Sequence, residues 1–284
     1  MFNLAQNTPE WLAWRKDKIG ASDAPVIMGD SPWCTPYKRW QEKLGLVEQK
    51  PQTWAMKRGI DNEQKARDTF RIFTEIETAP KVLVHPGLEW MVASMDGVSA
   101  CGRIGIEIKC PGAADHAEAK AYRVPKKYYA QLQHQHAVGQ FDKLYYASLG
   151  KDESFHYFEV PRDDEYIKRL IAKEKDFYEC ICNLESPSFH DSDFDLRVDA
   201  DFEEAAGRWT SAKLRLKEAE QEESALHARL VDLTNGRPCR GAGVRVTPYM
   251  RKGSLDYAAL KESLKIDLEP YRRASIVCWR VKEE

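Results

Sequence analysis

A short run of alternating apolar and charged residues, Ile104–Lys109, sets the strongest limit on the architecture of this chain. Its isoleucines favour a β-strand, and the twofold side-chain repeat of a strand places Glu107 and Lys109 on one face and the isoleucines on the other. Such a strand needs a sheet that buries its apolar face. Its charged face is either an exposed surface, where Lys109 forms an ordinary cross-strand pair with Asp96 or Glu107, or the wall of a functional site.

Helical and strand-like patterns surround this run and predict one α/β or α+β core. Apolar residues spaced three and four apart indicate helices, and short β-branched runs between turn residues indicate strands. The predicted helices are 53–74, 113–122, 125–138 and 163–182, and the predicted strands are 81–84, 90–95, 104–109, 143–149 and 154–160. This order is typical of a central mixed sheet flanked by helices.

The chain changes character near residue 190, after the turn-forming segment Glu185–Ser188. We therefore expect a core over residues 1–190 and an appendage over residues 191–284. Apolar spacing between residues 205 and 233 predicts one long amphipathic helix, which either packs on its own chain or forms an intermolecular coiled coil. A small β-rich unit should follow, with strands at 243–247 and 276–281 around a short helix at 257–264.

Composition narrows the functional classes. The net charge is −2 over 284 residues, so any contact with nucleic acid has to come from local geometry and not from a broad basic surface. The seven cysteines are scattered, without a C-x2-C pair; this argues against a zinc or iron–sulfur site and favours structural thiols. No apolar run approaches the ~20 residues of a membrane helix, and the start lacks a signal-peptide pattern. We expect a cytoplasmic protein.

Two carboxylates, Glu63 and Asp96, are candidates for a functional role because of where the sequence places them. Glu63 falls on the predicted buried stripe of the 53–74 helix, and a carboxylate that faces a core is costly unless it is paired, protonated or bound to a metal. A salt bridge to an arginine is the alternative. Asp96 ends the 90–95 strand at a turn, from which a hairpin returns it toward Glu107. The stripe itself is formed by Met56, Ile60, Ala66, Phe70 and Phe73.

Together these side chains form a more specific pattern than any one of them alone. Carboxylates on adjacent strands, with a third from a packed helix, provide the oxygen ligands that Mg²⁺ or Mn²⁺ prefers. A lysine two residues beyond Glu107 can hold a water or offset charge on a phosphate. Such a set suits the hydrolysis of a phosphodiester. The pattern therefore predicts a metal-dependent nuclease whose active site contains Glu63, Asp96, Glu107 and Lys109.

Other candidate residues lie outside this group. Arg15 is expected against apolar surface, where bidentate binding of a phosphate would repay its burial, and Ser22 could cap the next helix beside an anion site. An internal salt bridge for Arg15 and simple capping for Ser22 are the alternatives. The pair Lys126–Lys127 could touch a DNA backbone, although a solvated helix start is favoured. His134 and His136 lie on different faces of a helix and are interpreted as structural.

Five stretches of the chain occur in a recognisable order. They are Trp14–Arg15 leading to Ile19–Asp23, Gly59 with Glu63, Ser94–Gly97, Glu107–Lys109 and Tyr128–Gln133. In this order the chain resembles the lambda exonuclease and YqaJ-type viral recombinase nucleases of the PD-(D/E)xK superfamily, over roughly residues 11–150. Met95 stands where the superfamily pattern has proline, at a position that supplies no ligand.

This resemblance implies a restriction-endonuclease-like core and assigns roles to the residues of the site. Asp96, Glu107 and the backbone carbonyl of Ile108 would bind one or two Mg²⁺ ions, with Mn²⁺ as a substitute. Glu63 would complete the metal site or hold its water. Lys109 would orient the attacking water.

The same resemblance implies further roles and the activity. Gln131 looks like the family's glutamine near the attacking water, with a plain buried amide as the alternative, and Arg15 with Ser22 would grip the 5′-phosphate of the digested strand. We expect a phage-type recombination nuclease that digests one strand of double-stranded DNA from its 5′ end and leaves a 3′ overhang for an annealing protein. Members of the family form toroidal trimers, so the resemblance also implies a homotrimer.

Two other readings stay open. A site-specific or structure-specific endonuclease of the same superfamily would keep the metal residues but would need no pocket for a 5′-phosphate. A non-catalytic DNA-binding or scaffold protein would use the long helix as an interaction surface. The intact set of Glu63, Asp96, Glu107 and Lys109 argues against the second of these.

Overall fold

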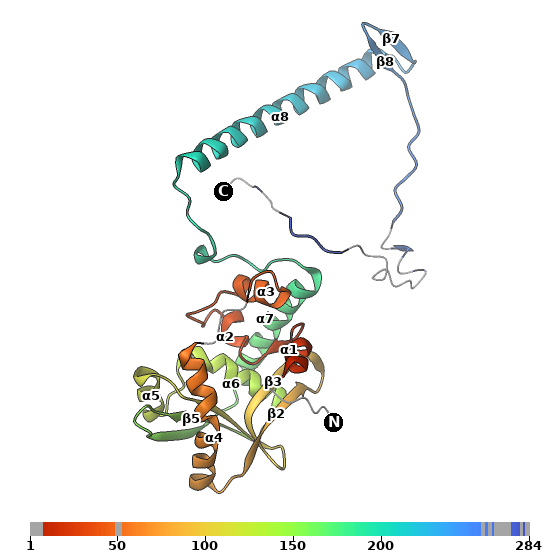
Figure 1. The fold of residues 1–284 in the computed structure, drawn as a ribbon. Coiled ribbons are helices and arrows are strands. Elements are labelled where there is room, and N and C mark those ends of the chain that lie inside the picture. The colour runs from red at the N-terminus through yellow and green to blue at the C-terminus, as the bar shows by residue number, and fades with distance from the viewer. Residues whose placement is uncertain are drawn as a thin grey trace. The chain divides into compact units, whose positions relative to one another are not determined.

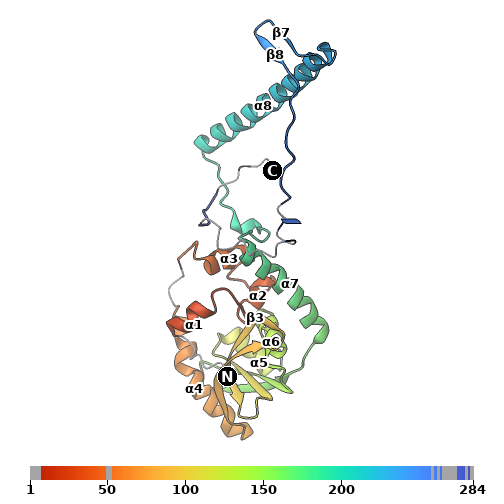
Figure 2. The same cartoon turned by 90° about the vertical axis from the view of Figure 1, so that its right-hand side faces the viewer.

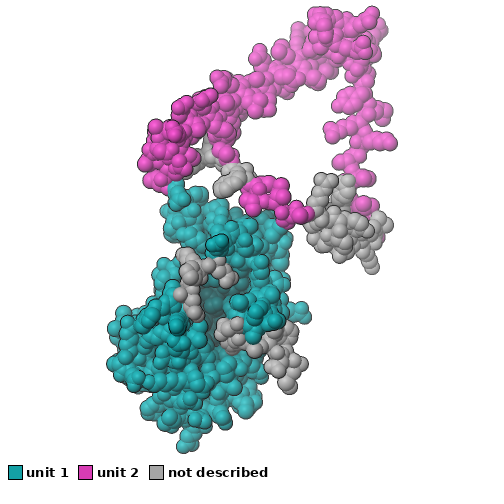
Figure 3. Space-filling model, in the orientation of Figure 1, with its two compact units in different colours: residues 1–195 teal, residues 196–284 magenta. Residues whose placement is uncertain are grey.

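The computed structural model describes residues 8–48, 53–256, 259–260, 263, 274–278 and 281. Its internal contacts divide the chain into two compact units, Met1–Asp195 and Leu196–Glu284 (Figure 3). Within the described ranges, no helix is both long and apolar enough to cross a membrane. The assignment of a nuclease core to residues 1–190 and of an appendage to residues 191–284 stays a prediction.

A six-stranded mixed sheet forms the centre of the first unit (Figure 1). Its strands are β1 Ile19–Gly20, β2 Thr78–His85, β3 Leu88–Ser99, β4 Ile104–Lys109, β5 Lys143–Leu149 and β6 Phe155–Val160. The order is β1-β3-β4-β5-β6, with β2 paired to β3 beside that path. β4 is antiparallel to β3 and parallel to β5. The parallel pairing of β4 and β5 brings the carboxyl ends of these strands to the same edge of the sheet.

Helices cover this sheet, which confirms the predicted α/β architecture. The helices of the first unit are α1 Pro9–Trp14, α2 Ala24–Ile27, α3 Pro36–Leu44, α4 Trp54–Thr74, α5 Ala113–Lys120, α6 Lys126–Gly139, α7 Asp164–Asn183 and the 3-10 helix η1 Asp191–Asp193. In Figure 2, α4 and α7 lie on opposite sides of the sheet. Thr8, Thr35 and Thr53 cap α1, α3 and α4, because each hydroxyl accepts a backbone N–H three residues further on.

The two faces of β4 meet different helices, as the alternation of its side chains predicts. Ile106 and Ile108 pack in a buried cluster with Ala66 and Phe70 of α4. Glu107 meets amide side chains of α6 instead. The sheet therefore buries its apolar face under α4 and turns the acidic residue of β4 toward α6.

Asp96 lies inside β3 and not at a turn that ends the strand, so this part of the sequence interpretation is wrong. β3 continues to Ser99, and its pairing with β2 shifts between Ala79↔Val98 and Lys81↔Met95. Two residues of β3, Asp96 and Gly97, therefore lie opposite the single residue Pro80. Because proline has no N–H to donate to the ladder, the extra residue is accommodated as a β-bulge, a feature that commonly redirects side chains beside active sites.

The predicted buried stripe of α4 is only partly correct. Ala66 and Phe70 are fully buried, but Met56, Ile60 and Phe73 are 60%, 52% and 61% exposed. The turn that carries Ala66 and Phe70 packs against β4 and β5, whereas Phe73 contacts Phe155 and Tyr157 of β6 with most of its side chain exposed.

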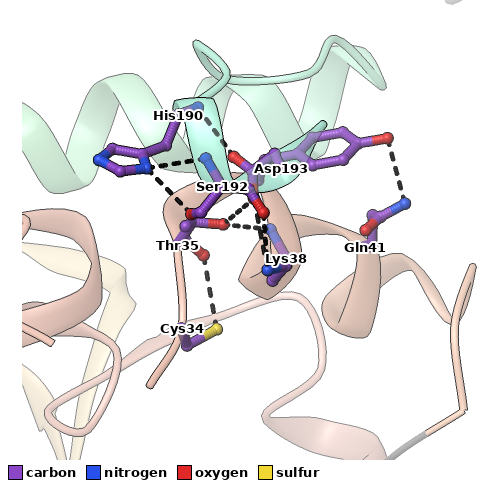
Figure 4. Close-up of polar contacts among 8 residues, drawn as sticks. Cys34, Thr35, Lys38, Gln41, His190, Ser192 and Asp193 are labelled. Atoms are coloured by element: carbon purple, nitrogen blue, oxygen red, sulfur yellow. Dashed lines mark hydrogen bonds and ion pairs between the residues drawn. The ribbon is translucent and has the colours of Figure 1, made fainter. Parts of the chain in front are cut away.

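The last segment of the first unit docks on the N-terminus of α3 (Figure 4). The Thr35 hydroxyl donates to Asp193 Oδ1 over 2.5 Å, and Lys38 Nζ donates to the Ser192 carbonyl over 3.2 Å. The Phe189 ring packs on Tyr37, with 4.4 Å between the ring centroids. These contacts hold α3, whose following turns carry two cations of the site described below.

The second unit contains a long helix and a short hairpin. α8 spans Ala200–Leu233, is capped by Asp199 and has no buried residue. β7, Cys239–Gly241, pairs with β8, Val244–Val246. The predicted strand near residue 244 is therefore confirmed, but the described residues 276–278 and 281 are not in a strand, so that prediction is wrong for them. Residues 279 and 280 and most of the predicted 257–264 helix lie outside the described residues.

Candidate active site

Glu107 is the buried centre of the candidate site. Its side chain is 2% exposed, and its carboxylate is surrounded by donors from two elements. Lys109 Nζ and Gln131 Nε2 each donate to Oε1 over 2.5 Å. Gln135 Nε2 donates to Oε2. A buried carboxylate with three donors is held in one orientation, because each hydrogen bond restricts its rotation.

Asp96 reaches the same place from the bulge in β3. Its Oδ2 accepts the backbone N–H of Ile108 over 2.7 Å, so a side chain takes the position that a strand carbonyl would otherwise fill. Burial raises the pKa of the Asp96 carboxyl well above its usual range, and the charges of Glu107 and Glu63 add to this rise. Three carboxylates thus lie close enough to repel one another.

Glu63 comes from α4 and already has a partner. Its carboxylate pairs with Arg67 one turn further along the helix, so the salt bridge considered as the alternative is present. Burial nevertheless raises the pKa of Glu63, and the charge of Glu107 contributes to the rise. Arg58 fixes this part of α4 to the ends of β4 and β5, because Nη1 donates to the Cys110 carbonyl over 2.7 Å and Nη2 donates to the Gly150 carbonyl over 3.2 Å.

Lys109 is the cation of this group. Burial alone would lower the pKa of Lys109, but the carboxylates of Glu107 and Asp96 outweigh that effect and raise the pKa overall. The ammonium also lies 5.2 Å from the centroid of the Tyr128 ring. Lys109 therefore stays charged and is held between the acidic pair and an aromatic face.

The donor set fits a hard divalent cation. Asp96, Glu107 and Glu63 supply carboxylate oxygens, and Ile108, whose N–H binds Asp96, supplies a backbone carbonyl next to Glu107 in β4. Their mutual repulsion is the electrostatic situation that a bound cation relieves. The side chains of the described residues do not by themselves form a group of three or more His, Cys, Asp or Glu arranged as metal ligands. The fit to a divalent cation therefore rests on the oxygen donors, one of them a backbone carbonyl, and on the repulsion among the three carboxylates.

A second cluster surrounds Arg15 at the end of α1. The guanidinium lies 4.3 Å from the centroid of the Trp11 ring, and its Nη2 donates to the Ser22 hydroxyl over 3.4 Å. Burial lowers the pKa of Arg15, and Arg39 adds to this effect while Asp23 opposes it. Ser22 does not cap α2, as the sequence had suggested, because Asp23 occupies that position. Ser22 is instead exposed beside the guanidinium.

Three residues of this cluster were not among the sequence-based candidates. The buried Asp23 carboxylate pairs with Lys43 at 2.8 Å and with Arg39 at 3.5 Å, and it accepts the Gly20 N–H over 2.9 Å. Burial would raise the pKa of Asp23, but Lys43, Arg39 and Arg15 together lower it. Asp23 forms its ion pairs with the two cations of α3, whereas Arg15 acts on it through its charge and directs a hydrogen bond to Ser22. These contacts join distant elements, so no local pattern could reveal them.

Gln135 was also missed, although a signal was present. It follows Gln131 by four residues and therefore lies on the same face of α6. The sequence directed attention to the two histidines on either side of it. Both are buried, as expected for structural residues: His134 contacts Glu174 and the Val92 carbonyl, and His136 contacts the Val160 carbonyl.

Known proteins resemble this chain in sequence and in fold. YqaJ of Bacillus subtilis (strain 168) is 29% identical over 181 residues, which are 62% of this chain. The chain spans 57% of the length of that relative. The crystal structure of an alkaline exonuclease, LHK-Exo, from Laribacter hongkongensis superimposes with a TM-score of 0.55 and 24% identity, covering 63% of this chain and 94% of that one. The structure of LHK-Exo in complex with dAMP gives a TM-score of 0.55 and 25% identity, with the same coverage.

The family comparison concerns the part of the chain that carries the site. The model of the YqaJ-like viral recombinase domain matches residues 10–142. This range contains Arg15 and Ser22 as well as the acidic group around Glu107. Residues 10–142 are therefore similar to a YqaJ-like viral recombinase domain.

Proposed function

We propose that this chain is a Mg²⁺-dependent exonuclease that digests one strand of double-stranded DNA from its 5′ end and leaves a 3′ overhang. The observation that carries the proposal is the convergence of Asp96, Glu107 and Lys109 from the bulge of β3 and from β4. A YqaJ-like domain and a fold like that of an alkaline exonuclease support phosphodiester hydrolysis of DNA.

The acidic residues would hold the metal. Mg²⁺, or Mn²⁺ in its place, would be bound by Asp96, Glu107 and the Ile108 carbonyl, with Glu63 completing the set. The bound ion supplies Lewis-acid chemistry for phosphodiester hydrolysis. Gln135 and Gln131 fix the Glu107 carboxylate before any substrate arrives, so the protein does not have to order this ligand during turnover.

The remaining donors would act on the substrate. Lys109 and Gln131 converge on one oxygen of Glu107, so a water or a phosphate oxygen at this point meets both an ammonium and an amide donor. Preorganised donors of this kind stabilise negative charge that develops on the phosphate. Lys109 would orient the attacking water, and Gln131 would lie beside it.

Arg15 and Ser22 would bind the 5′-phosphate of the digested strand. Because Asp23 is engaged by Lys43 and Arg39, the guanidinium of Arg15 keeps its charge for a substrate anion. A guanidinium beside an exposed hydroxyl suits a terminal phosphate, which offers several acceptor oxygens. This cluster is the basis for preferring an exonuclease over an endonuclease of the same superfamily.

Further parts of the proposal rest on the family resemblance. We infer that the protein acts in the bacterial cytoplasm as a homo-oligomer, expected to be a trimer, and delivers its 3′ overhang to a single-strand annealing protein. Enclosure of DNA by a ring would allow processive digestion by a chain whose net charge is only −2.

One digestion assay tests the proposal. Purified protein with Mg²⁺ is given linear duplexes that carry a 5′-phosphate, a 5′-hydroxyl or a closed hairpin at each end, together with covalently closed circular DNA. We expect rapid digestion from the phosphorylated ends, slower digestion from the hydroxyl ends, intact hairpins and circles, and no digestion by Asp96→Asn.

The other outcomes separate the rival functions. Cutting of closed circles would identify an endonuclease and would remove the proposed role of Arg15. Equal digestion of phosphate and hydroxyl ends would also remove that role but would keep the metal site. A chain that binds DNA and digests none of these substrates would be a binding or scaffold protein.

A further inference from the structure

An exposed indole lies close to the candidate active site and is not explained by it. Trp33, in the loop between α2 and α3, is 64% exposed. Its backbone N–H donates to Ser31 Oγ over 3.3 Å. In the same loop Asp30 pairs with Lys126 at 2.9 Å, which ties the loop to the first turn of α6. The loop that carries Trp33 is thus tied to α6.

A series of cation–ring contacts connects Trp33 to the catalytic lysine. Lys127 Nζ lies 4.8 Å from the Trp33 ring and 5.4 Å from the Tyr128 ring. Lys109 Nζ lies 5.2 Å from that same Tyr128 ring. Lys127 is in turn held by Asp115 at 2.7 Å. The favoured sequence interpretation of Lys127 as a solvated helix start is wrong, because its side chain is only 22% exposed.

This arrangement leaves a flat aromatic surface for a ligand. Lys127 covers one side of the indole, and the large exposed fraction of Trp33 leaves the other side open to a planar group. Exposed aromatic rings beside cations are the elements that bind single strands without regard to sequence: bases stack on the ring, and the cations attract the backbone. The contacts through Tyr128 and Lys127 link this surface to Lys109, so a strand whose phosphate lies at Lys109 would reach it within a few nucleotides.

We propose that Trp33 is a stacking platform for a nucleobase of the strand being digested, within three nucleotides of the scissile phosphate. This inference rests on the proposed nuclease function. The stacked base would be one that has left the duplex, since an indole can cover the full face only of a base that has lost its neighbour in the helix. Trp33 would hold that strand in line with Lys109 and would accept any of the four bases.

A chemical double-mutant experiment tests the platform. The substrates are duplexes with a 5′-phosphate that carry all bases or a single abasic site at the first, second or third nucleotide of the digested strand. The enzymes are wild type, Trp33→Phe, Trp33→Ala and Trp54→Ala. Trp54 is the matched control because it is 68% exposed and also has a lysine over its ring, Lys151 at 5.5 Å.

We expect Trp33→Ala to lower kcat/KM about tenfold on intact DNA, mainly through KM, which is the scale of one stacked base. At one of the three abasic positions wild type should lose the same factor, and Trp33→Ala should lose nothing further. Trp33→Phe, which keeps a ring, should stay close to wild type. Trp54→Ala should leave the ratio between intact and abasic substrates unchanged.

Other results would overturn the platform. If Trp33→Ala has no effect, or loses the same factor at all three abasic positions, no base stacks on the indole. A change in oligomeric mass of Trp33→Ala, measured by light scattering, would assign the ring to contact with a second copy of the chain. If wild type digests no DNA at all, the nuclease function fails first and the platform fails with it.

Discussion

Glu107 shows how a single side chain can depend on several elements. Burying a carboxylate is costly unless its oxygens are satisfied, and here the donors come from β4 and from two turns of α6. Gln135 is the donor least able to touch a substrate, because it is fully buried. It acts through Glu107 and is therefore a positioning residue.

Replacing Gln135 should impair activity without unfolding the protein. Gln135→Leu keeps the approximate volume but removes the donor to Glu107 Oε2, so we expect digestion of linear DNA to slow by about 10- to 100-fold, with a higher Mg²⁺ requirement. Gln221→Leu, at an exposed glutamine of α8 in the second unit, is the control and should digest DNA normally. Normal activity of Gln135→Leu would show that Glu107 does not need this donor.

The buried pair His134 and Glu174 should make stability depend on pH. Because the Val92 carbonyl can only accept, His134 Nε2 carries a proton, and a second proton is shared between Nδ1 and Glu174 Oε1 over 2.7 Å. Burial lowers the pKa of His134, but Glu174 outweighs it and raises the pKa overall, while burial raises the pKa of Glu174. Both shifts mean that the folded chain holds a proton that the unfolded chain releases near neutral pH.

The direction in which stability changes with pH follows from this extra proton on the folded chain. The stabilisation is complete below the unfolded histidine pKa of about 6.5 and is lost as pH rises through the folded pKa, at up to about 1.4 kcal/mol per pH unit. In Glu174→Gln the amide donates to Nδ1 of a neutral histidine, so this decline should disappear. Urea unfolding between about pH 6 and pH 9 compares the two proteins. Parallel curves would mean that the pair takes up no proton on folding.

Residue-level roles were predictable where the signal was local. The alternation in β4 was enough to place Glu107 and Lys109 together, and the repeat of α6 could also have identified Gln135 beside Gln131. The pairing of Asp23 with Lys43 could not be read in this way, because it joins α2 to α3 through tertiary packing. The roles of Arg15 and Ser22 at a 5′-phosphate stay predictions.

At the scale of elements, the bulge in β3 is the feature that brings the acids together. Its position depends on Pro80 in the neighbouring strand, so the sequence around Asp96 alone predicts a turn and not a bulge. Gly97 is part of the same β-bulge. A Cβ at Gly97 would lie 2.6 Å from both Ile106 Cγ2 and Thr78 Oγ1, closer than packed atoms can approach.

Gly97→Ala should therefore destabilise the protein. Forcing apart β2, β3 and β4 at this crossing should cost about 1–3 kcal/mol, which is typical of an overpacked core. Gly87→Ala, in the turn between β2 and β3, is the control, since nothing lies within 4 Å of its added Cβ. Urea denaturation should give a lower midpoint for Gly97→Ala and an unchanged one for Gly87→Ala. Equal midpoints would mean that the strands accommodate the added methyl group without a loss in the free energy of unfolding.

α4 illustrates a different limit of sequence patterns. Its apolar residues keep helical spacing over most of its length, but only the turn around Ala66 and Phe70 is buried against the sheet. Periodicity reports which face of a helix is apolar and not how much of that face is covered. For the same reason the prediction that α8 is amphipathic leaves open what its apolar side meets.

At the scale of the whole molecule, the two units differ in how they are stabilised. Among the residues that the structure describes, the four clusters of buried apolar side chains all lie in the first unit, and α8 has no buried residue. The first unit should thus carry the cooperative unfolding of the protein.

Two truncations test this division. A fragment that ends at residue 195 should unfold in urea with a free energy within about 0.5 kcal/mol of the full chain. A fragment that ends at residue 187 also loses η1 and its contacts with Thr35 and Lys38, and should be less stable by about 1 kcal/mol. A large loss in the longer fragment would mean that the second unit supports the fold of the first.

Asp96 and Glu107 are proposed to bind a divalent ion, and equilibrium binding of Mn²⁺ tests this without reference to turnover. Free Mn²⁺ is followed by electron paramagnetic resonance as the ion is titrated into wild type, Asp96→Asn and the control Gln221→Leu. We expect saturable binding to wild type and to the control, and at least about tenfold weaker binding to Asp96→Asn. Binding that is equally tight in all three proteins, or absent from wild type, would show that Asp96 and Glu107 do not form a metal site.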